Sequence, residues 1–223
     1  MIEVRNLSKS YIGKRTVSAL CGVSFRIERG EMAAVMGPSG CGKTTLLNII
    51  GGLDRPSDGV VLVDGLDIAS LDDDALTRIR RRKIGFVFQF FNLLPTLTAI
   101  ENIALPLHLA GIGKKETEAR AAELIEIVGL TDRHDHLPDE LSGGEQQRIA
   151  MARALALHPP LILADEPTGN LDSKNGREVL SLFKRLQGQF GTTVLMVTHD
   201  STAAGFCSRV MRMQDGTLIQ GAA

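Results

Sequence analysis

The chain has 223 residues, a length that fits one domain or one domain with a lobe inserted into it. Hydrophobic residues make up 43% of it, close to the globular average, so a full hydrophobic core is possible. The 25 basic and 26 acidic residues give a formal charge of −1, which argues against a dedicated nucleic-acid binder, whose surface would carry a basic surplus. A local basic patch at residues 78–83 is still compatible with this balance.

The charges near residue 1, the length of the apolar runs and the cysteine spacing indicate the cellular compartment. Glu3 and Arg5 put charges where a signal peptide would need an apolar stretch, and no uninterrupted apolar run approaches the ~18 residues of a membrane helix. We therefore expect a protein that is soluble by itself and reaches a membrane only through a partner. Cys21, Cys41 and Cys207 are widely separated and match no metal-site spacing, which predicts free thiols in a reducing cytosol.

The first 88 residues predict an alternation of strands and helices. Short apolar runs predict strands at residues 2–4, 23–27, 32–36, 60–63 and 84–88. Helices are expected at residues 44–50 and 71–82, the second with acidic residues at its favourable N-terminal end. The run at 32–36 enters a glycine-rich turn, which suits a buried strand.

Helical signals dominate from residue 89 to about residue 157. They predict helices at 99–109, interrupted by Pro106, at 114–128 and at 143–157. The alternation then returns, with elements at 161–164, 173–188, 192–198, 201–205 and 210–213. This order predicts one domain spanning residues 1–223. Its α/β core takes in 1–88 and 158–223, and its helical insertion takes in 89–157.

Residues 37–44 (GPSGCGKT) match the phosphate-binding pattern G-x-x-x-x-G-K-[ST] between a predicted strand and a predicted helix. The glycines let backbone N–H groups turn toward a β-phosphate without a Cβ clash. Lys43 would place a point charge near the β- and γ-phosphates, and the Thr44 hydroxyl would ligate Mg²⁺. The positive end of the following helix would face the same anion. The alternative is a glycine-rich strand–helix turn that binds no ligand.

An apolar run at residues 161–164 ends in two carboxylates, Asp165 and Glu166. A buried parallel strand delivers its last residues to the carboxyl edge of the sheet, where ligands bind in open α/β folds. Asp165 would hold Mg²⁺, directly or through water, and Glu166 would polarise a water for in-line attack on a γ-phosphate. The alternative is a solvated acidic turn.

Residues 141–148 (LSGGEQQR) have the pattern of a well-capped helix start. Ser142 suits the N-cap position, and Glu145 three residues later completes a capping box. Gly143 and Gly144 expose backbone N–H groups at the positive end of that helix, where phosphate can bind. The alternative is a capped helix without a ligand.

At this segment the chain resembles a known family, the ABC ATPases, because residues 141–146 are similar to their signature motif. Further family motifs follow in the expected order. Tyr11 resembles the aromatic that stacks on adenine, Gln89 the glutamine of the Q-loop, residues 170–172 (NLD) the D-loop with Asp172, and His199 the switch histidine. The resemblance covers essentially residues 1–220. It implies an α/β fold with a P-loop NTPase (RecA-like) core, an antiparallel β subdomain and an inserted α-helical subdomain that carries the signature.

The resemblance also implies a mechanism. Family members bind two ATP molecules, with Mg²⁺, at the interface of a head-to-tail homodimer, and the signature of one subunit caps the ATP on the phosphate loop of the other. Ser142 and Gly144 would then contact the γ-phosphate in trans. ATP closes this dimer, while hydrolysis and product release reopen it.

The candidate site residues fall into five groups. Those expected to act in catalysis are Glu166, His199, Lys43 and Gln89. Those expected to bind ATP are Tyr11, Gly37, Pro38, Ser39, Gly40, Cys41, Gly42, Lys43, Thr44 and Thr45. Those expected to bind the partner's ATP are Ser142, Gly143, Gly144 and Glu145. The D-loop contributes Asp172, and the expected ligands of Mg²⁺ are Thr44, Gln89 and Asp165.

Residues 88–95 (FQFFNLLP), 98–103 (TAIENI) and 164–173 (ADEPTGNLDS) are similar to one branch of the family. That branch contains macrolide-efflux, lipoprotein-releasing, antimicrobial-peptide-resistance and cell-division ATPases. It implies an ATPase that powers export or extraction of a lipophilic or peptide-like cargo through a separate integral membrane permease. The chain would be cytoplasmic and peripheral on the cytoplasmic face of the inner membrane, without nucleic acid.

Two alternatives to this function are kept. One is the ATPase of a non-transport transmembrane signalling complex of the cell-division type, and the other is a soluble ABC ATPase of DNA repair or translation. The second would need long coiled-coil insertions or a fused second ATPase domain, and this sequence shows neither.

Two local segments carry expectations of their own. The apolar side chains of residues 90–95 are expected to be mixed, some packing inward and some facing a groove that accepts a short helix from the permease. We also expect bound ATP to shield Cys41 from alkylation, because this thiol lies inside the phosphate loop.

Overall fold

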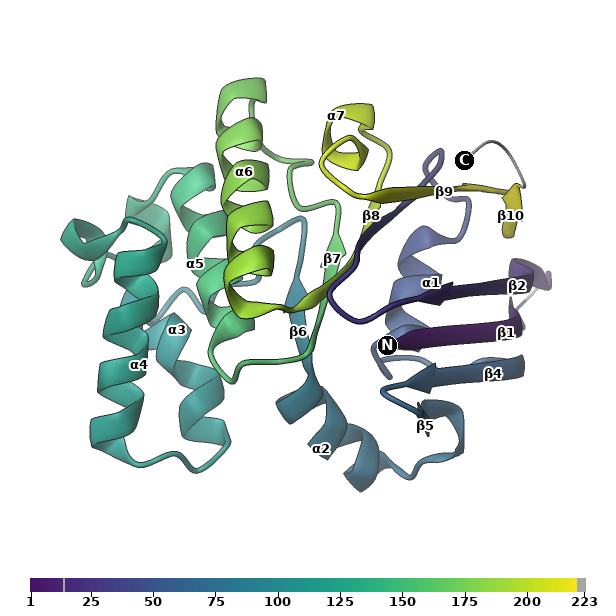
Figure 1. The fold of residues 1–223 in the computed structure, drawn as a ribbon, viewed down its shortest axis with the longest axis horizontal. Coiled ribbons are helices and arrows are strands. Elements are labelled where there is room, and N and C mark those ends of the chain that lie inside the picture. Colours follow the sequence, from purple (N-terminus) through teal and green to yellow (C-terminus); the bar gives the residue numbers. More distant parts are fainter. Residues whose placement is uncertain (14, 220–223) are drawn as a thin grey trace.

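The computed structural model describes residues 1–13 and 15–219 and builds them around two sheets (Figure 1). The larger sheet runs, in spatial order, through β10 (Thr217–Ile219), β9 (Arg209–Gln214), β3 (Met32–Met36), β8 (Thr193–Thr198), β7 (Leu161–Asp165) and β6 (Ile84–Val87). All neighbours in it are parallel except β10, which pairs antiparallel with β9 at the edge. The central strands are buried along their length, as expected for a sheet covered on both faces.

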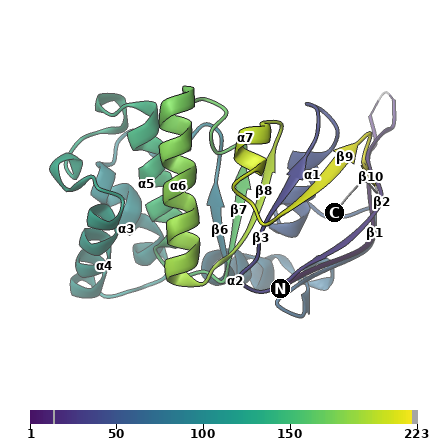
Figure 2. The same cartoon turned by 45° about the horizontal axis from the view of Figure 1, so that its top comes forward.

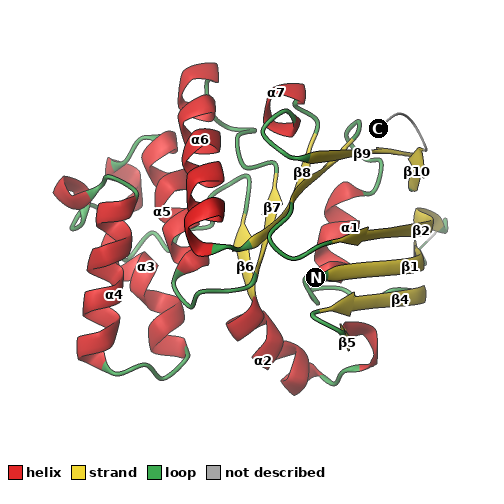
Figure 3. Cartoon of the chain, viewed as in Figure 1, coloured by secondary structure: helices red, strands yellow, loops and turns green. Residues whose placement is uncertain are grey.

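The smaller sheet is antiparallel and lies at the opposite side of the molecule from the long helices, as the colouring by secondary structure shows (Figure 3). Its strands, in spatial order, are β2 (Val17–Ile27), β1 (Ile2–Tyr11), β4 (Asp58–Val63) and β5 (Leu66–Asp67). Helix α1 (Lys43–Ile50) lies between the two sheets and buries Leu46, Ile49 and Ile50 in a core that both sheets share. The phosphate loop is therefore anchored to two sheets at once.

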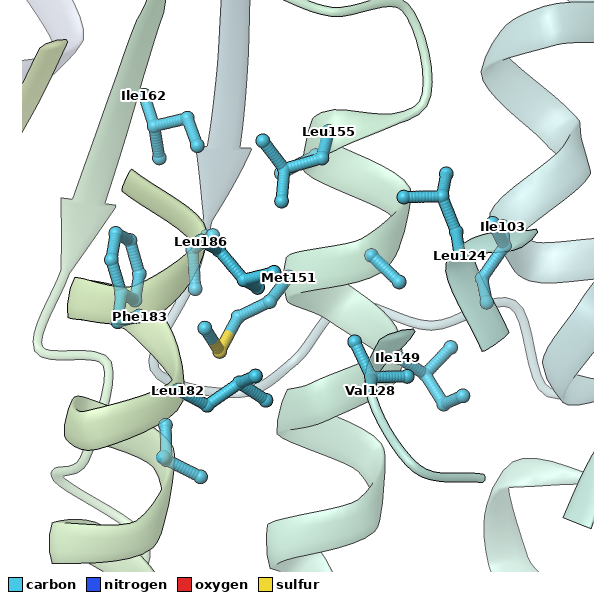
Figure 4. Close-up of a cluster of buried hydrophobic side chains, with 14 of the residues drawn as sticks. Ile103, Leu124, Val128, Ile149, Met151, Leu155, Ile162, Leu182, Phe183 and Leu186 are labelled. Atoms are coloured by element: carbon cyan, nitrogen blue, oxygen red, sulfur yellow. The ribbon is translucent and has the colours of Figure 1, made fainter. Parts of the chain in front are cut away.

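The other α-helices follow α1 along the chain. They are α2 (Asp73–Lys83), α3 (Ala99–Leu109), α4 (Lys114–Ile127), α5 (Gly143–Leu155), α6 (Ser173–Phe190) and the short α7 (Ser201–Ala204). Helices α3, α4 and α5 pack together, α5 also packs against β6, and α6 lies beside α5 in both views (Figures 1 and 2). Ile103, Leu124, Ile149, Met151 and Phe183 fill the core between them (Figure 4).

The order of strands and helices agrees with the sequence prediction, but several details differ. Strand β1 runs on to Tyr11 instead of ending near residue 4, because its polar second half pairs with β2 through three register shifts that break the apolar alternation. Strand β2 begins at Val17, earlier than expected, and the short strands β5 and β10 were not predicted. The expected interruption at Pro106 is wrong, since α3 continues through it and loses only the one hydrogen bond that proline cannot donate.

Asn102 of α3 fixes the loop that precedes this helix. Its side chain is fully buried; its Oδ1 accepts from Leu94 N at 2.8 Å and its Nδ2 donates to the carbonyls of Leu94, Leu97 and Thr98 at 2.9–3.1 Å. Four backbone contacts of the loop thus depend on one amide.

Asn102→Ala is expected to lower the free energy of unfolding by about 2–4 kcal/mol, because buried backbone groups would lose their partners. Chemical denaturation followed by circular dichroism measures this difference. His108→Ala, at an exposed position of the same helix, is the control and should change stability by less than about 0.5 kcal/mol. Equal stability of the two variants would contradict the prediction.

The topology brings four chain segments to one edge of the larger sheet. The carboxyl ends of parallel strands meet there, so β3 delivers Gly37, β7 delivers Asp165, β8 delivers Thr198 and β6 leads toward Gln89. Within residues 1–13 and 15–219, no helix has the length and apolar character needed to cross a membrane.

Candidate active site

The loop between β3 and α1 requires glycine for steric reasons at two positions. Gly42 adopts φ 106° at the start of α1, and a Cβ there would collide with the carbonyl oxygen of Ala19. A Cβ on Gly37 would collide with the carbonyl oxygen of Met213 on β9. The close approach of backbone to backbone explains why both positions carry no side chain.

The Lys43 side chain folds back onto the loop that precedes it. The side chain is buried, and its Nζ donates to the carbonyl oxygens of Gly37 at 2.8 Å and Pro38 at 3.0 Å. The same Nζ lies 3.8 Å from Glu166 Oε1, so the charge of Lys43 faces the end of β7. A buried ammonium held by carbonyl oxygens can exchange them for the stronger, charge-assisted bonds that an anion offers.

Thr44 and Asp165 meet beside Lys43. The Thr44 hydroxyl donates to Asp165 Oδ1 at 3.3 Å. Burial raises the pKa of the Asp165 carboxyl above its ordinary value and the Glu166 carboxylate adds to the rise, while the Thr44 hydroxyl and the Lys43 ammonium oppose it. A hydroxyl and a carboxylate fit Mg²⁺, which binds one or two protein oxygens together with phosphate oxygens. In the described part of the chain, no group of three His, Cys, Asp or Glu side chains forms a metal cage.

Glu166 is the most constrained residue of this edge. Its φ of 45° lies in the left-handed region that non-glycine residues rarely adopt, and its N–H donates to Val197 O at 2.9 Å. Its Oε2 accepts from the Thr198 hydroxyl at 3.1 Å and from His199 N at 3.2 Å. Its Oε1 lies 2.9 Å from His199 Nδ1. Such backbone strain persists only where surrounding contacts hold the residue in place. Here the contacts to Thr198 and His199 fix the direction of the carboxylate.

Gln89 is hydrogen-bonded to the loop that follows β7. Its Nε2 donates to Asn170 Oδ1 at 3.3 Å, and Asn170 Nδ2 donates to Gln89 O at 2.9 Å. Asp172 caps α6 by accepting from Lys174 N and Asn175 N, each at 3.0 Å, and these bonds lower its pKa. Gln89 makes no hydrogen bond to Thr44 or Asp165 within residues 1–13 and 15–219, so its predicted role as a metal ligand is not reflected in a direct contact.

The signature segment forms the predicted capping box at the start of α5. Glu145 Oε2 accepts from Ser142 N at 2.8 Å and from the Ser142 hydroxyl at 2.6 Å, and Glu145 N donates back to that hydroxyl oxygen at 3.4 Å. The bonds from Ser142 hold the pKa of Glu145 below its ordinary value. Among the described residues, no hydrogen bond or ion pair joins residues 142–145 to residues 37–45. One chain therefore brings together the phosphate loop and the carboxylates, but not the signature.

Tyr11 ends β1, and its half-exposed ring carries the Lys9 ammonium 4.8 Å from its centroid. Its hydroxyl donates to Asp54 Oδ2 at 2.7 Å, and burial followed by this bond raises its pKa. The ring is thus partly open to solvent. The Cys41 side chain is only 5% exposed and packs in the core, so the protein itself covers this thiol, and its shielding by ATP stays a prediction.

The segment after Gln89 is mixed, as expected. Phe90 is 72% exposed and Leu94 is also exposed, whereas Leu93 packs against the core. Phe91 and Asn92 both have positive φ, and Arg153 of α5 donates to their carbonyl oxygens at 2.8 and 2.6 Å. Sequence reasoning missed this arginine, as it missed Thr198, although the position of Thr198 directly before His199 offered a signal.

The comparisons with known proteins agree with this geometry. A family model described as ABC transporter matches residues 20–169. The chain therefore belongs to the ABC transporter ATP-binding family, with a P-loop NTPase fold and ATPase activity.

Individual relatives show to which branch of the family the chain is similar. The chain is 50% identical over 221 residues to MJ0796, an uncharacterized ABC transporter ATP-binding protein of Methanocaldococcus jannaschii, over 97% of this chain and 94% of that protein. It is 45% identical over 218 residues to the lipoprotein-releasing system ATP-binding protein LolD of Bacteroides thetaiotaomicron, over 98% of this chain and 99% of that one. With the macrolide export ATP-binding/permease protein MacB of Rhodopirellula baltica it shares 48% over 223 residues, which is 99% of this chain and 33% of MacB.

Solved structures give the same result. A dimeric structure of MJ0796 aligns with a TM-score of 0.91 at 48% identity, covering 99% of this chain and 97% of that one. A second MJ0796 dimer, in a post-hydrolysis state with ADP and Pi, gives 0.90 at 47% over the same shares. The chain is thus an ABC cassette of the branch that includes LolD and MacB.

Proposed function

We propose that this chain is the ATP-hydrolysing subunit of a complex that exports or extracts a lipophilic or peptide-like cargo through a separate membrane permease. The observation that carries the proposal is the meeting of Lys43, Thr44, Asp165, Glu166 and His199 at one sheet edge, with the signature left outside it. A lipophilic or peptide-like cargo is supported by the names of two relatives, the lipoprotein-releasing LolD and the macrolide export protein MacB. Peripheral attachment to the cytoplasmic face of the inner membrane follows through the permease.

The residues of this chain would divide the chemistry among them. Lys43 would exchange its carbonyl partners for the β- and γ-phosphates, which are better acceptors for an ammonium. Glu166 would accept the proton of the attacking water, and His199, 2.9 Å from it, would hold that carboxylate toward the γ-phosphate. Thr44, Asp165 and Gln89 would hold Mg²⁺, which would neutralise charge developing on the phosphates. Tyr11 would stack on adenine through the exposed part of its ring.

The second half of each site would come from another copy of the chain. Ser142, Gly143 and Gly144 stand at the positive end of α5, which favours binding of a phosphate at that helix end. Because that end does not contact the phosphate loop of its own chain, a head-to-tail homodimer supplies the arrangement in which both are used. The dimeric MJ0796 structures support this assembly.

A groove of about 510 Å³ beside the Gln89 segment suits the permease. Residues of α2, β6, α3 and α5 line it, among them the apolar Phe86, Phe88 and Leu105 and the basic Arg80, Arg81 and Arg153. Leu109, 62% exposed, stands at its rim. A short amphipathic helix would bury apolar area here.

Leu109→Glu is expected to weaken association with the permease at least tenfold, because a charge would face an apolar partner surface. Co-purification from membranes with affinity-tagged chain measures this. Leu66→Glu on β5, 48% exposed and outside the groove, is the matched control and should bind normally. Normal binding by both variants would contradict the docking site.

Reconstitution tests the whole proposal. The membrane protein that co-purifies with the chain is placed in liposomes with it, and ATP hydrolysis and cargo release are followed together. We expect the permease to stimulate hydrolysis and cargo to leave the bilayer only with ATP. Stimulated hydrolysis without movement of any lipophilic or peptide cargo would instead favour a signalling complex.

A further inference from the structure

A buried amide links the signature helix to the turn that carries the catalytic carboxylate. Gln147 lies one turn into α5 and is completely buried. Its Nε2 donates to Pro167 O at 2.5 Å, and Pro167 directly follows Glu166. The contact joins residues 20 positions apart in sequence, in two different motifs.

The orientation of this amide is fixed by its partner. Turning it over would set Oε1 against the carbonyl oxygen of Pro167, and proline has no N–H to offer. With Nε2 bonded, Oε1 is the one buried side-chain nitrogen or oxygen without a hydrogen-bond partner in residues 1–13 and 15–219. Glutamine leaves one buried acceptor unmet, its own Oε1, and an apolar side chain would leave another, Pro167 O, so the two costs of about 1–3 kcal/mol nearly cancel. Stability therefore does not explain a glutamine here.

Two further contacts connect the same elements. A Cβ on Gly143 would lie 3.2 Å from Leu171 Cδ2, and a Cβ on Gly144 would lie 3.3 Å from Asn175 Oδ1. Asn175 in turn donates to Asp172, the cap of α6, at 2.6 Å. The first two turns of α5 thus meet the segment at Pro167, Leu171 and Asn175, and α5 and α6 are neighbours in both views (Figures 1 and 2).

We propose that Gln147 is a positioning residue that couples the two ATP sites of the dimer through a single chain. This rests on the proposed homodimer, in which the start of α5 serves the partner's ATP while Glu166 serves the chain's own. Movement of α5 toward the partner's γ-phosphate would be passed by Gln147 to the Pro167 turn and so would set the direction of Glu166. The free Oε1 gives this contact a second bonding position when the turn shifts.

Gln147→Met tests the proposal, because methionine matches the length of glutamine but cannot donate to Pro167 O. We expect kcat to fall about tenfold, equivalent to 1.4 kcal/mol, while KM and the melting temperature stay near those of the unchanged chain. In a Glu166→Gln background, ATP-dependent dimerisation should persist. Gln187→Met is the control, since Gln187 Nε2 makes the same kind of bond to Gly30 O at 2.7 Å far from both motifs, and its kcat should be unchanged.

Hydrogen exchange separates coupling from a loss of structure. In the Glu166→Gln chain, ATP should protect the start of α5 and also the amides of Gly169 and Leu171, which close the turn at 2.9 and 3.1 Å. Adding Gln147→Met should keep the protection of α5 and remove that of the turn. This measurement needs no ATP turnover, so it reports directly on the contact between Gln147 and the Pro167 turn.

Three results would overturn the inference. They are an unchanged kcat, turn protection that survives Gln147→Met, or a fall in kcat matched by a fall in melting temperature and dimerisation. If the Glu166→Gln chain alone formed no dimer with ATP, the proposed function itself would fail, and this inference with it. If the Glu166→Gln chain with Gln147→Met added forms the dimer normally and its turn stays protected, only the role of Gln147 is contradicted.

Discussion

Glu166→Gln is expected to lower kcat for ATP hydrolysis by roughly 10²–10⁴-fold, the range over which a positioned general base contributes. The change removes the basic carboxylate while keeping the shape of the side chain. An amide oxygen can still accept from the Thr198 hydroxyl and from His199 N, so the turn at the end of β7 keeps its hydrogen bonds. ATP binding should therefore survive, and single-turnover assays with radiolabelled ATP separate the two steps.

The same substitution should lengthen the life of the closed state. If hydrolysis reopens the dimer, a chain that binds but does not cleave ATP accumulates closed. Glu178→Gln is a matched control, since this exposed residue of α6 lies outside the site, and it should turn over normally. Wild-type turnover by Glu166→Gln would remove Glu166 from its assigned role.

Lys43→Ala is expected to weaken ATP binding by on the order of 100-fold, because charge-assisted hydrogen bonds to the phosphates would be lost. It would also leave the Glu166 carboxylate, 3.8 Å away, without its cation in a largely buried position. The effect is on binding itself, in contrast to the effect of Glu166→Gln on turnover. Isothermal titration with ATP in the presence of Mg²⁺ measures it.

Lys114→Ala is the control for the loss of one positive charge. Among the residues that the structure describes, Lys114 pairs only with Glu118 on the exposed surface of α4, at 3.8 Å, and an exposed pair of this kind contributes little. Its affinity for ATP should equal that of the unchanged chain. Equal affinities for ATP in both lysine variants would show that Lys43 does not face the phosphates.

Much of the fold and the site was predictable because the signals are local in sequence. The glycine-rich loop at 37–44, the strand ending at Asp165 and the capping box at Ser142 each lie within eight consecutive residues, so spacing alone indicated their form. Parallel strands then bring their carboxyl ends to one edge, which placed Asp165 beside Thr44.

What could not be predicted depends on residues far apart in sequence. Gln89 meets Asn170 across 81 positions, and Thr198 meets Glu166 across 32, so no local pattern marks either pair. The direction of a side chain within a loop is equally hidden, and the sequence gives no sign that the thiol of Cys41 turns into the core. The polar second half of β1 lacked alternation because of its register shifts.

In the proposed homodimer each chain carries two halves of two different ATP sites. The most direct test measures the solution mass of the Glu166→Gln chain by light scattering, with and without ATP, and repeats it with Ser142→Arg added. We predict a particle of twice the 24.0 kDa chain mass with ATP, and a loss of that dimer when the arginine blocks the start of α5. A chain that binds ATP and stays at its single-chain mass, or a dimer indifferent to Ser142→Arg, would contradict the account.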